Sequence, residues 1–158
     1  MSTTNTARLA ALGLVLPPVP VPAASYVPAV RHGDLIVVSG QLPTVDGRVI
    51  ATGRVGDGPG EHDVAAAAEL ARRCALNVLA AAASVAGGLD AIASVLRLGV
   101  FVASGDGFAE QHLVANGASE LMLAVLGPDA AHARAAVGVP SLPRGAPVEV
   151  EAILAVAA

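Results

Sequence analysis

The stretch AHARAAVGVPSLPRGAPVEVEAIL, residues 131–154, contains two apolar runs separated by a segment rich in proline and glycine. The runs cover residues 133–140 and 147–156, and each has the length and β-branched content of a strand. Proline and glycine between two such runs are typical of a turn or loop. This stretch therefore predicts the last two strands of a sheet at the carboxyl end of the chain.

The few charges in this stretch lie at alternating positions of the two strands. Side chains alternate between the faces of a strand, so Arg134 shares one face with Ala136 and Gly138. By the same rule Glu149 and Glu151 share one face of the last strand. We expect all three charges on the face away from the helix-packed core, with open space beside the arginine.

The remaining sequence predicts an α+β fold. Residues 5–14 could form a short helix, and the prolines of VLPPVPVPAA, which follow, favour an extended arm. Further expected elements are strands on either side of a turn at residues 32–34, helices over 62–86 and 108–126, and a strand over 94–104 buried on both faces. We divide the chain into an arm, residues 1–24, and one domain, residues 25–158. Two helices can cover one face of a mixed sheet, so a second subunit is the simplest cover for the other face.

Composition excludes several classes of function. The chain has 158 residues and a net charge of −4, and all nine basic residues, counted without histidine, are arginine. Without lysine it can form neither a phosphate-binding loop of the lysine type nor a Schiff base. One tyrosine and two phenylalanines leave little to stack on bases, so a nucleic-acid partner is not expected.

Other features indicate a cytoplasmic protein without a metal. We find no membrane-spanning segment and no secretory signal, and the single cysteine, Cys74, excludes a disulfide framework. Cys74 lies on the apolar stripe of a predicted helix and is expected in the core. The four histidines lack the spacing of a metal site. Asn77 is expected to bond the backbone of a loop rather than a ligand.

The charges of the last two strands allow two interpretations. A guanidinium group matches a carboxylate with two parallel hydrogen bonds, so Arg134 suits a small anionic ligand. A nearby glutamate can hold and deprotonate a water molecule if burial moves its pKa toward neutral pH. In the simpler interpretation, Arg134 forms a structural ion pair with a glutamate across the sheet or between subunits.

Several motifs together resemble the RidA, or YjgF-like, family of imine and enamine deaminases, also labelled endoribonuclease L-PSP or translation initiation inhibitor. The motifs are YVPAV at 26–30, LIVVSGQLP at 35–43, Asn77, FVAS at 101–104, HARAAVGV at 132–139 and LPRGAPVEVEAI at 142–153. The resemblance runs from about residue 24 to the end of the chain.

The resemblance implies a chorismate-mutase-like fold and a homotrimer whose clefts lie between subunits and need no metal or cofactor. It implies that Arg134 holds a substrate carboxylate, and that Glu149 is linked to the water that attacks the imine carbon. The reaction would convert an imino acid and water to a 2-oxo acid and ammonia.

The resemblance also places Tyr26, Ser39, Gly40 and Asn116 in the substrate-binding cleft. Tyr26 could close the cleft or fill an interface, and Asn116 could equally face solvent. Ser39 and Gly40 are expected to offer backbone rather than a nucleophile. We add His132, which lies near the proposed cleft, and Glu151, which shares a face with Glu149.

Three positions differ from the usual family motif. His132 replaces a proline, and Ala135 and Ala136 replace the serine and the common cysteine that follow the arginine. With the amino-terminal arm, these differences indicate a divergent subgroup similar to the longer bacterial members. A non-catalytic trimer that binds small carboxylates is the alternative function, and a ribonuclease is a weaker one.

Overall fold

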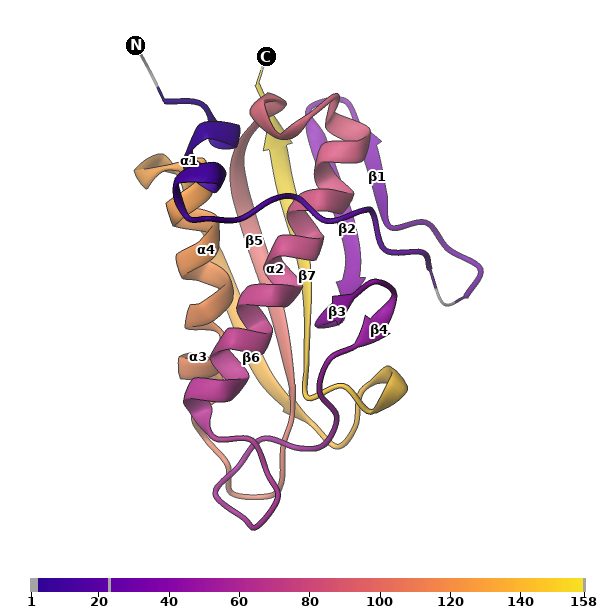
Figure 1. Ribbon diagram of the computed structural model, residues 1–158, viewed down its shortest axis with the longest axis vertical. Helices are drawn as coiled ribbons and strands as arrows, with labels where there is room; N and C mark the ends of the chain where they lie inside the picture. The colour runs from indigo at the N-terminus through magenta and orange to yellow at the C-terminus, as the bar shows by residue number, and fades with distance from the viewer. Residues whose placement is uncertain (1–2, 23, 158) are drawn as a thin grey trace.

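The computed structural model describes residues 3–22 and 24–157, which form a layer of helices over one face of a mixed sheet (Figure 1). The helices and strands, in chain order, are α1 (Asn5–Ala11), β1 (Ala29–His32), β2 (Leu35–Gln41), β3 (Thr44–Val45), β4 (Arg48–Val49), α2 (Val64–Ala86), β5 (Ile92–Ala103), α3 (Gln111–Val114), α4 (Asn116–Leu126), β6 (Ala133–Val139) and β7 (Val148–Val156). Short 3-10 turns follow α2 and α4 and precede β7. The α+β class is confirmed.

The main sheet has five strands in the order β1-β2-β7-β5-β6. β5 and β6 are parallel, and the other neighbours are antiparallel. The last strand of the chain, β7, therefore lies at the centre, and β6 lies at an edge. The turn predicted at residues 32–34 joins β1 to β2, with Gly33 in the left-handed region at φ 59°. β3 and β4 form a separate hairpin.

Helix α2 is the main cover of the sheet, and its ends carry recognisable caps. The Asp63 side chain accepts a hydrogen bond from the Ala66 amide at 2.8 Å, and Gly87 ends the helix at φ 95°. Its predicted apolar stripe is buried except at the half-buried Val85, and Cys74 is fully enclosed. Asn77 donates to the carbonyl groups of Leu42 and Thr44, as expected for a residue that holds a loop.

The core lies between the helices and one face of the sheet. Ile36, Leu98, Val150 and Leu154 contribute from the strands, and Leu121 contributes from α4; all five are fully buried. At about 1.5–3 kcal/mol for each large apolar side chain, such burial is the main source of stability.

Two predicted elements differ from the structure. The helix expected over 108–126 is interrupted at Ala115 and forms α3 and α4, just before Gly117, which is a poor helix former. The strand expected over 94–104 is not buried on both faces throughout. Its first half exposes Leu96 (43 %) and Arg97, because none of the described residues covers this part of the second face of the sheet.

The second face of the sheet is open and partly apolar. Leu35, Val37 and Val137 are 45 %, 54 % and 48 % exposed. Within the described residues, no helix is both long and apolar enough to cross a membrane.

The amino-terminal segment is attached to the domain. Asn5 donates from Nδ2 to the carbonyl groups of Leu89 and Ile92 at 3.1 and 2.8 Å, and Leu9 is buried in the core. The arm then crosses in front of α2 toward β1 (Figure 1). A domain boundary at residue 24 stays a prediction.

The contact between α2 and α4 depends on Gly117. A Cβ atom on this residue would collide with the Ala68 carbonyl group. We expect Gly117→Ala to lower the free energy of unfolding by about 1–3 kcal/mol, because overpacking outweighs the gain of about 1 kcal/mol in helix propensity. Urea unfolding should reveal this loss, whereas Glu120→Ala on the exposed face of α4 should change stability little. Equal stability of wild type and Gly117→Ala would contradict the tight contact.

Candidate functional site

Glu149 lies on the open face of the sheet, in space left by a missing side chain. It is half-buried, and a Cβ atom on Gly40 of β2 would collide with its carboxyl group. A β-bulge at this point of β2, between Val38 and Gln41, brings Gly40 beside β7. Gly40 therefore makes room for the Glu149 carboxyl group.

Burial raises the pKa of Glu149 above its usual range, and the nearby charge of Glu151 adds to this effect. A raised pKa moves a carboxyl group toward the range in which it can both accept a proton and return it. The pKa shift of Glu149 therefore has the direction that an acid–base residue requires.

Glu151 has a different environment on the same face. Its Oε1 atom lies 3.0 Å from Nη1 of Arg97, and this is the only salt bridge among the residues that the structure describes. Both side chains are substantially exposed, so the pair adds little stability. A role of Glu151 in substrate binding stays a prediction, and its nearest cation is Arg97.

Tyr26 and Ser39 lie near Gly40 at the end of β2. The Ser39 hydroxyl group donates to the Val27 carbonyl oxygen at 2.8 Å, which holds the segment after Tyr26 against the sheet. Tyr26 is 48 % exposed and lines a small pocket together with Gly40. Tyr26, Ser39, Gly40 and Glu149 thus form one group, which we call the glutamate half-site.

Arg134 is not on the face predicted for it. It pairs with Leu98 of β5, which is fully buried beneath the helices, whereas Glu149 pairs with Phe101 and Glu151 with Gly99, whose side of β5 is the open face. The predicted alternation of side chains between the two faces of each strand is confirmed. However, β5 lies between β6 and β7, and its pairing with each determines which of their residues face the same side of the sheet. Arg134 therefore faces the helices, opposite to Glu149.

The Arg134 guanidinium group is held by the start of α4 and by α3. Nη1 donates to Oδ1 of Asn116 at 3.0 Å and to Oγ of Ser119 at 2.9 Å, and Nη2 donates to the His112 carbonyl oxygen at 3.0 Å. Of its five N–H groups, the Nε–H and one on Nη2 have no acceptor among the described residues. Arg134 is therefore positioned but still able to bind an anion.

His132 supports this arrangement through Ser119. Nδ1 of His132 lies 2.9 Å from the Ala130 carbonyl oxygen, which can only accept, so the network assigns the proton to Nδ1. In the neutral ring Nε2 then accepts from the Ser119 hydroxyl group at 2.9 Å, and the Ser119 oxygen accepts from Arg134. Arg134, Asn116, Ser119 and His132 form a second group, the arginine half-site.

The structure thus divides the predicted site residues into two half-sites on opposite faces of the sheet. Asn116 and His132 were predicted to bind substrate; in this chain Asn116 contacts Arg134 directly and His132 reaches it through Ser119. Ser119 was missed from the sequence, although its place three residues after Asn116 on one helix was a usable signal. A structural ion pair between Arg134 and a glutamate of the same chain is excluded among the described residues. Those residues include no cluster of three or more His, Cys, Asp or Glu side chains suited to a metal ion.

The contact between Ser119 and His132 predicts energetic coupling. Ser119→Ala removes a donor from His132 and an acceptor from Arg134, so we expect it to cost about 1–2 kcal/mol of unfolding free energy. In a double-mutant cycle with His132→Ala, the two changes should differ from additivity by about 0.5–1.5 kcal/mol. Ser84→Ala, which removes a bond within α2, should add independently to His132→Ala. Additive effects of Ser119→Ala and His132→Ala would contradict the network.

The raised pKa of Glu149 predicts a pH-dependent stability. At a pH below the unfolded-state pKa, the carboxyl group is protonated in both states and favours neither. As pH rises through the window between the unfolded and folded values, the unfolded chain loses its proton first, and the free energy of unfolding falls. We therefore expect Glu149→Gln to gain stability relative to wild type as pH rises through this window.

Urea unfolding at a fixed protein concentration over this pH range measures the effect. Glu120→Gln, at an exposed position of α4, is the matched control and should show no such gain. If the difference in unfolding free energy between Glu149→Gln and wild type did not change with pH, the folded and unfolded pKa values of Glu149 would be equal.

Comparisons with known proteins identify relatives along nearly the whole chain. Residues 18–156 match the family model described as Endoribonuclease L-PSP. Protein TCP17 of Trypanosoma cruzi is 44 % identical over 149 residues, which are 94 % of this chain and 91 % of that protein.

Solved structures agree with this family. The protein Atu1372 of Agrobacterium tumefaciens, whose function is described as unknown, has a TM-score of 0.84 and 46 % identity, covering 97 % of this chain and 92 % of its own. The YjgF gene product of E. coli has a TM-score of 0.61 and 28 % identity, covering 86 % and 91 %. The predicted resemblance is confirmed: the chain belongs to the Endoribonuclease L-PSP family, which includes the YjgF-type proteins.

Proposed function

We propose that the protein hydrolyses small reactive imino or enamino acids to 2-oxo acids and ammonia. The observation that carries this proposal is the half-buried Glu149, with its raised pKa, in the space beside Gly40. A positioned Arg134 with two available N–H groups supports it. Together they supply an acid–base group and a carboxylate receptor, which imino-acid hydrolysis requires.

The proposed reaction has a series of proton transfers that one carboxyl group can perform in turn. Arg134 binds the substrate carboxylate, which places the carbon of the protonated imine near a water molecule held by Glu149. Glu149 accepts a proton from the water as the water oxygen bonds to the carbon, and then gives this proton to the nitrogen. As the carbon–nitrogen bond breaks, Glu149 takes the hydroxyl proton, and ammonia and the 2-oxo acid leave. Glu149 passes this last proton to ammonia or solvent and is ready for the next turnover. One water is consumed for each imine bond, and no redox step occurs.

The two half-sites can act together only if they come from different subunits. Within one chain they lie on opposite faces of the sheet, separated by β5. The exposed apolar residues of the open face favour association with further copies. We therefore place the reaction in clefts between subunits of a homotrimer, as the family resemblance implies.

Hydrolysis of 2-iminopropionate and related imino acids, generated in the assay, tests the proposal. Release of the 2-oxo acid should be accelerated by the wild type. Glu149→Ala should lower kcat about a hundredfold or more, since general acid–base groups contribute this much. Arg134→Ala should raise KM, because it removes the carboxylate receptor, whereas Arg48→Ala on the β3–β4 hairpin should retain full activity.

A mixture of the Arg134→Ala and Glu149→Ala variants, assayed at a substrate concentration well below the KM of Arg134→Ala, tests the division between subunits. Each intact cleft needs Arg134 from one subunit and Glu149 from another. Random reassembly of equal amounts of Arg134→Ala and Glu149→Ala chains should restore about a quarter of wild-type activity. If both residues acted within one chain, mixing would restore nothing.

Two other outcomes would replace the proposed reaction. Saturable binding of a small carboxylate without turnover of any imine would indicate a binding protein, with Arg134 as its receptor. Cleavage of RNA that persists through repurification and disappears in a half-site variant would indicate a ribonuclease. The net charge of −4 and the presence of only three aromatic residues in this chain do not favour ribonuclease activity.

A further inference from the structure

A second pocket lies on the helix-covered side of the molecule, beneath the proline-rich arm. Its volume is about 360 Å³, and arm residues 17–21 form one wall. The opposite wall consists of Arg73 and Asn77 of α2, the turn of the β3–β4 hairpin, and Arg144. We call this space the arm pocket. It includes no residue of either half-site.

Prolines restrict the backbone of the arm wall, and the segment before it is anchored to the domain. Three of the five residues 17–21 are prolines, which hold the backbone extended at little entropic cost. Before the arm, Asn5 and Leu9 anchor α1 to the domain, and after it the chain enters β1. The restricted arm therefore favours a pocket that is already formed when a ligand binds.

Two arginines of the arm pocket have N–H groups without an acceptor among the described residues. Nε of Arg73 donates to the Thr44 carbonyl oxygen at 2.7 Å, and Nη2 of Arg144 donates to the Gly47 carbonyl oxygen at 2.9 Å. These bonds orient both guanidinium groups, and neither group has a carboxylate within salt-bridge distance in the described part of the chain. Asp46, at the exposed rim, is the acidic residue of the lining, so positive charge predominates.

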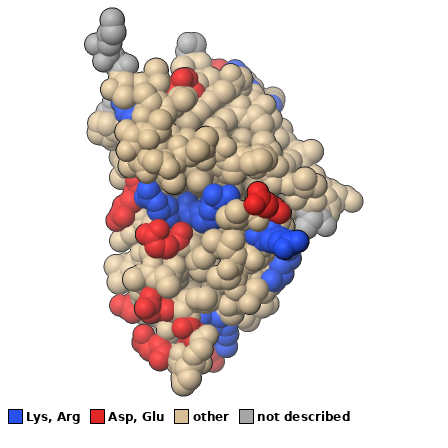
Figure 2. All heavy atoms as spheres, in the orientation of Figure 1, with Lys and Arg blue, Asp and Glu red and all other residues tan. Residues whose placement is uncertain are grey.

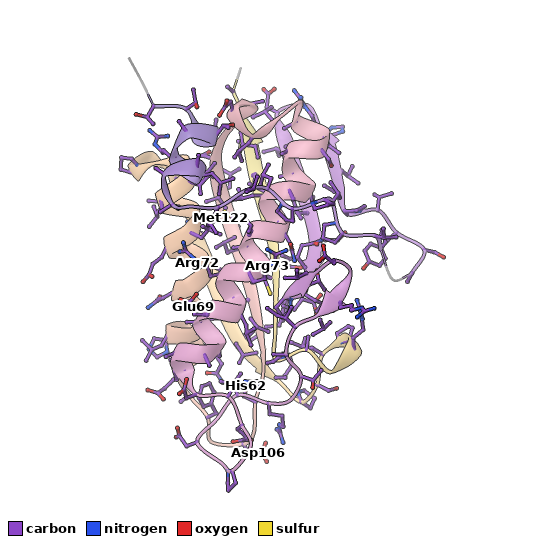
Figure 3. The ribbon with its side chains drawn as sticks, viewed as in Figure 1. His62, Glu69, Arg72, Arg73, Asp106 and Met122 are labelled. Atoms are coloured by element: carbon purple, nitrogen blue, oxygen red, sulfur yellow. The ribbon has the colours of Figure 1, made fainter. Side chains whose placement is uncertain are left out.

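The pictures agree with this distribution of charge. Figure 2 shows basic side chains gathered across the middle of the face that the arm crosses, although the whole chain has a net charge of −4. Figure 3 places Arg72 and Arg73 side by side on α2 in the same region. A local basic site on an acidic protein is suited to an anionic ligand.

The backbone of Arg144 supplies an independent indication. It lies in the left-handed region at φ 59°, where glycine would be free of strain. The turn nevertheless carries an arginine, whose guanidinium group reaches the arm pocket. Strained residues of this kind are concentrated at binding sites.

We propose that the arm pocket binds the phosphate or carboxylate group of a small molecule. Arg144 and Arg73 donate to its oxygen atoms, and the arm encloses the remainder. The proposal does not depend on imine hydrolysis, because the arm pocket includes no residue of either half-site.

Isothermal titration of the full-length protein tests this binding with two anions, inorganic phosphate and succinate. Neutral succinamide serves as the uncharged control. We expect saturable binding of at least one anion, no binding of succinamide, and affinity at least about tenfold weaker in Arg144→Gly. Glycine removes the guanidinium group and suits the left-handed turn, so the fold should be retained. The preferred anion distinguishes a phosphate ligand from a carboxylate ligand.

Three variants make the test specific. Arg48→Gln removes a charge from the β3–β4 hairpin at a position outside the pocket lining. This variant should bind the anion with the affinity of the wild type. Arg73→Gln should weaken binding even if Arg144→Gly proves unstable. Arg134→Gln distinguishes the two sites and should leave the affinity unchanged. Absence of saturable binding, or binding that is lost in Arg134→Gln and retained in Arg144→Gly and Arg73→Gln, would overturn the proposal.

Discussion

Strand β5 lies between the two strands that carry the candidate catalytic residues, and this position governs what one chain can do. It is hydrogen-bonded to β6 on one side and β7 on the other, so its pleat sets which face each neighbour presents. With Leu98 buried beneath the helices, Arg134 must face the helices and Glu149 must face away. A one-residue shift of β7 would reverse this, but it would also move Val148, Val150 and Leu154 out of the core. The separation of the half-sites is therefore tied to the stability of the fold.

Much of the fold could be predicted because its signals are local. The stripe through Leu70 and Val78, the cap at Asp63 and the glycine stop of α2 are all readable from residues near one another in sequence. Which residues of β6 and β7 share a face of the sheet is not a local property, since it depends on the pairing of both strands with β5, which precedes them in the chain. The contact of Ser119 with His132 and Arg134 also joins α4 to β6, and no periodicity in either element identifies it.

The arm connects two regions that the sequence left separate. Pro20, Val21 and Arg144 line both the arm pocket and the smaller pocket that contains Tyr26 and Gly40. A ligand held under the arm would therefore touch a wall that it shares with the glutamate half-site. Energetic coupling between the arm pocket and the glutamate half-site would require a shared element such as the arm. The strength of this coupling depends on whether the arm adopts one position or two. The prolines favour one position, so we expect the arm to shape the cleft rather than to act as a switch.

The acid–base character of Glu149 depends on what faces it in the proposed cleft. In one chain, burial and Glu151 raise its pKa. A second copy would bury the carboxyl group further, which raises the pKa, and would bring Arg134 nearby, which lowers it. A bound substrate carboxylate would neutralise the Arg134 charge and leave burial and Glu151 as the remaining influences. Substrate binding itself would then increase the proton affinity of Glu149 at the stage when it must take a proton from water.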